Sequence, residues 1–198
     1  IVTQATTTGF EEFFIKTILG SDGAIQILDK LQATQRSMAA GGYGSGFAIQ
    51  LKEGVKYVEG IDEPKRLRHV LDSFSNVTGV ADVLKGQVDI ISSFKSEGAR
   101  VYGIDVQDYL HVSNLAGQIA QGELGDFQRA PSGALLGKEL AERLQLSVGD
   151  SFQLRSTGPI RRYKVSATFE TGISEIDRVR LYLNIGEARS LLRKPTGV

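Results

Sequence analysis

Short apolar runs separated by polar turns constrain the fold of this chain more than any other feature of its sequence. Runs rich in β-branched residues lie at 80–84, 88–91 and 101–104, and their spacing predicts successive strands. Four later strands are expected at residues 134–136, 151–154, 163–169 and 180–183. The chain is therefore expected to build a sheet on which helices pack.

The region before these strands begins with a helical pattern. Thr8 and Glu11 are spaced as a capping box, which predicts a helix at 8–19. Two strands are expected after it, at 24–28 and 47–51. This segment is expected to form a helix that leads into a small sheet.

Three further helices are predicted. Asp62 can cap the first of them, Pro64 fits its first turn, and its apolar face runs to Phe74 and is expected to pack on the sheet. The other two are expected at residues 138–144 and 185–192. Helices and strands in this order predict the α+β class.

The weakest periodicity falls in the stretch 118–132, which favours a boundary near residue 120. Residues 1–120 are expected to form a first subdomain with a small mixed α/β sheet. Residues 121–198 are expected to form a second, mostly β subdomain with short helices and the terminal helix. The two-part organisation is a prediction from pattern alone.

Composition narrows the function classes. Lys plus Arg equals Asp plus Glu at 23 each, so no overall field draws the chain to nucleic acid. The absence of cysteine excludes disulfides, thiolate metal sites and cysteine nucleophiles. No apolar run is long enough to span a membrane. The chain opens at Ile1 and stops at Val198 just past a predicted helix, as a fragment of something longer would.

The glycine-rich run 41–46 does not have the pattern of a nucleotide site. It lacks the Lys and Ser or Thr of a phosphate loop, and its glycines miss the dinucleotide spacing. Tyr43 and Ser45 lie within this run, which is expected to be a turn or loop that exposes both side chains for contact with a partner. No cofactor is expected.

Catalytic and metal-binding patterns are weak. His69 and His111 each have one carboxylate at helical spacing, which is too few ligands for a metal site. Glu170, Glu175 and Asp177 interrupt two predicted strands and could supply an acid and a base, so a small hydrolase stays open as an alternative. A shaped connection between strands is the favoured interpretation of that segment.

A small basic patch surrounds a predicted turn. Arg155, Arg161 and Arg162 flank Pro159, and no aromatic residues are interleaved with them as they would be in a nucleic-acid surface. The turn is therefore a second candidate region for contact with a protein partner. No nucleic-acid partner is expected.

Three segments resemble one known family when they are taken together in order. The stretch from Leu136 to Asp150 pairs a helix with a Val-Gly-Asp turn that leads into a strand. Upstream, residues 101–105 read Val-Tyr-Gly-Ile-Asp, and residues 118–124 contain an isoleucine followed by a Gly-Glu pair. This combination resembles the extracytoplasmic core domain of MacB-type ABC transporter permeases, whose two subdomains are called Porter and Sabre.

Within that family the chain looks closest to the permeases of the lipoprotein-releasing (Lol) system. The likeness lies in residues 8–20, in the loop 169–177 and in residues 183–192. It implies a periplasmic domain of an inner-membrane permease, without catalytic residues of its own. It also implies that ATP hydrolysis on a separate cytoplasmic subunit moves the domain and so drives lipoprotein release.

The partners implied by this resemblance are a second permease subunit, the ATPase subunit, the lipoprotein substrate and a periplasmic lipoprotein carrier. An efflux permease that binds an adaptor protein is the alternative within the family. Residues 152–163 leave room only for a tight turn where the carrier-recruiting permease has a protruding hairpin. That difference argues against direct carrier capture and favours either the partner-type permease, which pairs with the carrier-recruiting one, or an undifferentiated relative of both.

The second difference from the family pattern lies at the C-terminus. In the family, a strand-helix-strand segment after the final helix completes the Porter-like subdomain, and this chain stops at Val198. The first subdomain is therefore expected to be incomplete. An unpaired strand edge is expected to let the chain associate with itself.

Overall fold

The structure is a computed structural model that describes residues 20, 23–28, 61 and 63–194. The α+β class is confirmed, because short helices alternate with strands of one sheet. The helices are α3 (Pro64–Asp72), α4 (Val106–Leu110), α5 (Leu124–Arg129), α6 (Lys138–Leu144), α7 (Ser174–Asp177) and α8 (Ile185–Leu192), with a 3-10 turn η1 (Leu115–Gln118). The strands are β1 (Val83–Ile91), β2 (Ser96–Ile104), β3 (Ile119–Gly122), β4 (Gly133–Gly137), β5 (Ser151–Arg155), β6 (Arg161–Phe169) and β7 (Arg180–Asn184).

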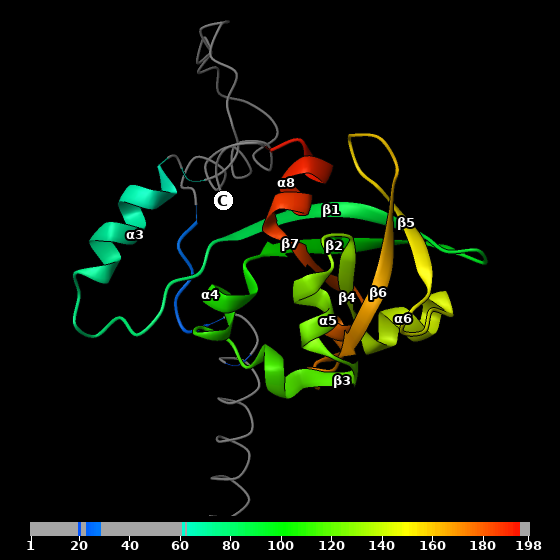
Figure 1. The fold of residues 1–198 in the computed structure, drawn as a ribbon, viewed down its shortest axis with the longest axis horizontal. Coiled ribbons are helices and arrows are strands. Elements are labelled where there is room, and N and C mark those ends of the chain that lie inside the picture. The colour runs from blue at the N-terminus through cyan, green and yellow to red at the C-terminus, as the bar shows by residue number, and fades with distance from the viewer. Residues whose placement is uncertain (1–19, 21–22, 29–60, 62, 195–198) are drawn as a thin grey trace, which may run out of the picture.

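The sheet closes on itself. Its strand order is β3-β6-β4-β7-β2-β1-β5, and β5 pairs with β6 as well as with β1. The pairings β2–β7 and β4–β6 are parallel, whereas β1–β2, β1–β5, β5–β6 and β4–β7 are antiparallel. Six strands therefore form a small barrel, and β3 pairs with the last residues of β6, beyond the part that pairs with β5 (Figure 1). Closure removes most of the exposed strand edge that an open sheet would carry.

The barrel interior is the larger of two hydrophobic cores. Alternate residues of the strands point inward, and α6 and α8 add Leu140, Leu144 and Leu191 to the same cluster. Gly103 of β2 lets α8 come close, because a side chain there would overlap Ala188. Helix α8 therefore packs directly on the strands β1 and β2 (Figure 1).

The second core covers one part of the barrel's outer face. It joins residues of β2, β4, β6 and β7 to α4, η1 and α5. Tyr182 lies at its centre, with Tyr102, Tyr109 and Phe169 as ring neighbours. Arg180 stacks 4.2 Å from the centroid of Tyr102 and donates to the Tyr182 hydroxyl at 3.1 Å. Among the described residues, no helix covers the outer face of β1 and β5 in this way.

Several predicted elements differ in the structure. The runs 80–84 and 88–91 were expected to be separate strands, but β1 continues through Gly86, where α8 leaves no room for a side chain. The strand predicted at 24–28 is wrong, because these residues form no strand and Ile25 is 85% exposed. The runs predicted at 101–104 and 180–183 lie within strands β2 and β7, which pair with each other in parallel.

The helix expected after Asp62 forms as α3, with Pro64 at its first position. Asp62 itself is outside the described residues, and Glu63 takes the N-cap position without a side-chain hydrogen bond. The expected packing of this helix on the sheet is wrong, because α3 buries no residue and Phe74 is 53% exposed. An ion pair between Arg68 and Asp108, at 2.7 Å, ties it to α4.

Other predictions are not reached by the described residues. The helix at 8–19, the strand at 47–51 and the glycine-rich run 41–46 all lie outside them. The boundary near residue 120 runs through the sheet, since β1 and β2 pair with β5 and β7. The division into two subdomains stays a prediction. Within the described ranges, no helix is long and apolar enough to cross a membrane.

Candidate partner-binding surface

The connection between β5 and β6 is short, as the sequence predicts. Leu154 pairs with Arg161, so residues 155–160 lie outside the β5–β6 ladder. Pro159 is exposed and Ile160 is 52% exposed. An exposed Pro-Ile pair beside arginines is a plausible contact surface, because apolar and arginine side chains carry much of the binding energy in protein interfaces.

The base of this turn is fixed to α8 by Glu187. The carboxylate of Glu187 accepts hydrogen bonds from Arg161 Nη1 and from the Tyr163 hydroxyl, both at 3.4 Å. Burial, followed by the charge of Glu187, raises the pKa of Tyr163 to about 12. Arg161, predicted as a contact residue, is therefore engaged in holding the turn.

Arg155 and Arg162 lie on the outer face of the hairpin. The Nε and Nη2 atoms of Arg155 donate to Asp89 Oδ2 at 3.2 and 3.0 Å. Arg162 is exposed, and no acceptor for its guanidinium is found among the described residues. Arg162 is thus the member of the predicted patch with the most freedom to meet a partner.

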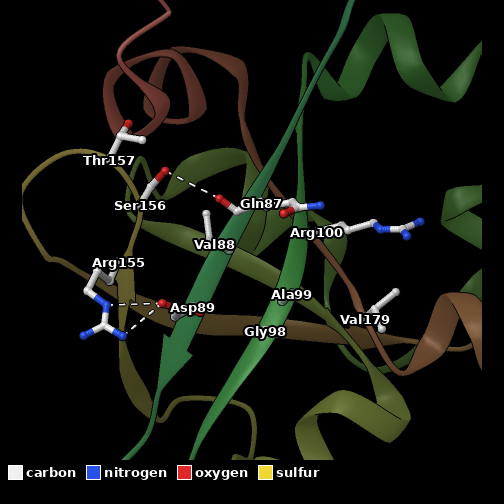
Figure 2. Close-up of a pocket in the computed structure, with 10 residues that line it drawn as sticks. All are labelled: Gln87, Val88, Asp89, Gly98, Ala99, Arg100, Arg155, Ser156, Thr157 and Val179. Carbon is white, nitrogen blue, oxygen red and sulfur yellow. Dashed lines mark hydrogen bonds and ion pairs between the residues drawn. The ribbon is translucent and has the colours of Figure 1, made fainter. Parts of the chain in front are cut away.

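A groove of about 440 Å³ begins at Arg155 and crosses the outer face of β1 and β2 (Figure 2). Ser156 Oγ donates to the carbonyl oxygen of Gln87 at 3.5 Å on one side, and Arg100 lies on the other side. This groove was not predicted from the sequence, because β1 was expected to be two separate strands. An uninterrupted strand over 83–91 would have placed Gln87 and Asp89 on one face.

The carboxylates of the alternative hydrolase site are used in different ways. Asp177 is 2% exposed and accepts hydrogen bonds from Thr171 N, Thr171 Oγ1 and Gly172 N. Glu170 accepts from Lys138 Nζ at 2.9 Å, which raises the pKa of that lysine. Asp177 therefore shapes the loop, as the favoured interpretation of the sequence expects.

The remaining candidates are dispersed. His69 and His111 are exposed, and the described residues contain no group of three His, Cys, Asp or Glu side chains that could hold a metal ion. Tyr43 and Ser45 lie outside the described residues, so their predicted contact role stays a prediction. Among the predicted contact residues, the structure brings Arg155, Pro159, Arg161 and Arg162 together at one hairpin.

Comparison with known proteins finds similar sequences and, separately, similar solved structures. Two strains of Xylella fastidiosa, Temecula1 and 9a5c, have a lipoprotein-releasing system transmembrane protein LolC that is 29% identical over 127 residues. Each match covers 59% of this chain and 30% of the relative, so the chain spans about a third of the length of these proteins.

Solved structures with a similar chain path are more distant in sequence. The extracellular domain of the ABC-type transporter YknZ from Gram-positive bacteria has 16% identity and a TM-score of 0.47, with 62% of each chain covered. The periplasmic region of MacB from Actinobacillus actinomycetemcomitans has 17% identity and a TM-score of 0.46, with 74% of this chain and 64% of that chain covered. The model of the MacB-like periplasmic core domain matches residues 1–197, and the chain therefore belongs to that family.

Proposed function

We propose that this chain is the periplasmic domain of an inner-membrane ABC transporter permease of the lipoprotein-releasing branch. In this role it couples ATP-driven movement to the release of lipoproteins, and it works by binding and not by catalysis. The 29% identity to LolC over 127 residues is the observation that carries the proposal. ATP hydrolysis is assigned to a separate cytoplasmic subunit, and a second permease subunit completes the transporter.

The fold suits a part that transmits movement. A closed barrel with α8 packed on its strands moves as one body, because close-packed cores deform little. The turn between β5 and β6 is held at its base by Glu187 and exposes Ile160, the last residue before β6. A rigid body with an exposed, preorganised turn can transfer a displacement to a partner.

The experiment measures binding of this chain to a purified periplasmic lipoprotein carrier, with a hairpin-bearing permease domain as positive control. Arg162→Glu and Ile160→Ser change the turn, and Arg129→Glu, at an exposed position of α5, is the matched charge control. Binding that is lost in the two turn variants and kept in the control places the carrier at the turn. No carrier binding, together with lipoprotein binding, favours the partner-type permease.

An efflux permease is the second candidate, because the family model that matches residues 1–197 is named for MacB. Such a permease would bind an adaptor protein in place of a lipoprotein carrier. The same chain and variants are therefore tested against a periplasmic adaptor. Adaptor binding without binding of carrier or lipoprotein would replace the lipoprotein-releasing function with the efflux function.

A further inference from the structure

The groove on the outer face of β1 and β2 is built from strand backbone with charged side chains at its two ends. Strand β5 pairs with β1 only from Asp89 to Ile91, and the chain then turns away at Arg155. The backbone around Gln87 and Gly98 forms the floor (Figure 2). We propose that this groove binds an extended, carboxylate-bearing segment of a partner protein.

Gly98 keeps the floor of the groove open. It lies opposite Asp89 in the β1–β2 ladder, so a side chain at this position would point to the groove side of the sheet. A Cβ built on Gly98 meets no atom within 4 Å, and the backbone there is not in the left-handed region. No packing or backbone reason requires glycine at this position, whereas an extended ligand lying across the strands needs the space.

The charge of the groove favours an acidic ligand. Its lining contains two arginines, Arg100 and Arg155, and one carboxylate, Asp89, which pairs with Arg155. Arg100 is exposed, and the described residues place no acceptor opposite its guanidinium. A guanidinium with unused donors in a groove binds carboxylates by charge-assisted hydrogen bonds. A second copy of this chain would bring the same positive charge to the contact.

The position of the two arginines favours a segment over a small acid. Figure 2 shows Arg155 on one side of the β1–β2 pair and Arg100 on the other. The groove is open to solvent along this path, unlike the enclosed pockets that bury most of a small ligand. Gln87, which pairs with Arg100 across the strands, supplies a neutral polar group between the ends, and Thr157 supplies another beside Ser156 at the Arg155 end. An extended chain can reach all of these groups at once.

The probe is a fluorescein-labelled peptide of alternating Glu and Gly, and fluorescence anisotropy measures its binding to the chain. A Gln-Gly peptide of equal length reports binding that does not depend on charge. We expect the acidic peptide to bind and the neutral one to bind much more weakly. Binding should weaken as salt is added, because the contacts are exposed ion pairs.

Two variants test the groove from different sides. Arg100→Glu should weaken binding of the acidic peptide by about tenfold, because it removes one guanidinium and adds repulsion. Gly98→Leu fills the floor without changing charge and should weaken binding to a similar degree, whereas Gly98→Ser should have a smaller effect. Arg129→Glu, an equal charge change on α5, should leave most of the binding intact.

Three outcomes would overturn the proposal. Equal loss in Arg129→Glu and Arg100→Glu would mean that only net charge attracts the peptide. Full binding in Gly98→Leu would place the peptide elsewhere. Competition by free glutamate at the same carboxylate concentration would indicate a small-acid site. The peptide assay needs no carrier or adaptor, so it can succeed or fail independently of the proposed transport function.

Discussion

Two connections between strands, 156–160 and 170–179, were both singled out from the sequence, and the structure uses them differently. In the second, Asp177 is buried and receives hydrogen bonds from the loop backbone at Thr171 and Gly172. In the first, Pro159 and Ile160 are exposed. Asp177 of the second loop serves the fold, while Pro159 and Ile160 of the first are left for contact.

The difference shows why charge in a loop does not by itself indicate function. A buried carboxylate with several donors contributes to stability, and its loss leaves those donors without partners. An exposed apolar residue contributes little to stability and is available to a partner. The predictions below test this contrast, beginning with the largest effect.

Asp177→Ala should destabilise the chain by about 3 kcal/mol, because backbone and hydroxyl donors of Thr171 and Gly172 lose a charged acceptor in a buried site. Chemical denaturation followed by circular dichroism measures the change. Glu175→Ala, an exposed position in the same loop, is the control and should change stability by less than about 0.5 kcal/mol. Equal effects in the two variants would contradict the assignment of Asp177 as the loop's anchor.

Tyr163, at the base of the first connection, should make the stability of the chain fall at high pH. Burial raises the pKa of Tyr163 to about 12, above its ordinary value of 10, so the unfolded chain loses this proton first. The contribution of Tyr163 to the free energy of unfolding is complete below pH 10 and declines as pH rises towards 12. Denaturation should show a decline of up to about 2 kcal/mol over this window. Tyr163→Phe should decline less, and parallel curves would contradict the role of Tyr163.

The sequence predicts individual strands well where the strand pattern is local, but it does not predict that they close into a barrel. Residues 151–154, 163–169 and 180–183 lie within β5, β6 and β7. Apolar and polar residues alternate along the first two runs, and the third is short and mostly apolar, although β7 and most of β6 are buried on both faces. A turn was expected at the stretch that contains Gly86, since glycine usually marks a turn. The structure instead requires glycine at this position because Leu192 of α8 lies against it, and a contact between residues so far apart leaves no local pattern in the sequence.

The candidate surface was predicted in part. A basic turn could be seen at Arg155–Arg162 in the sequence, but the pairing of Arg161 with Glu187 joins residues far apart in the chain. Which arginine is free is decided by tertiary contacts. The groove at Gly98 depends on two strands lying side by side, so it too was beyond a reading of single segments.

Helix α3 offers an intermediate case between the two loops, because it buries no residue yet is tied to α4 by one ion pair. The hydrogen bond from Arg68 lowers the pKa of Asp108, so this contribution is present above the ordinary value of 3.8 and is lost as pH falls below it. Both side chains are 33% exposed, and Asp108→Asn should cost only about 0.5 kcal/mol.

Hydrogen exchange resolved by segment is the measurement for this ion pair. Amides of α3 should exchange faster in Asp108→Asn, while those of β1 and β2 keep their protection. Asp72→Asn, an exposed residue on α3 itself, serves as the control. Uniformly faster exchange across the barrel would show that α3 is part of the cooperative core and not an appended element.

The smallest effect on stability is expected at Ile160, the last residue of the first connection before β6. Ile160→Ser removes an apolar side chain that is already 52% exposed, so the free energy of unfolding should change by less than about 0.5 kcal/mol. The same variant should weaken binding of the periplasmic partner, because an exposed apolar residue next to Arg162 gains most when a partner covers it. Calorimetric titration beside a denaturation curve separates the two effects. A large loss of stability with unchanged binding would mean that this turn, like the loop of Asp177, serves the fold.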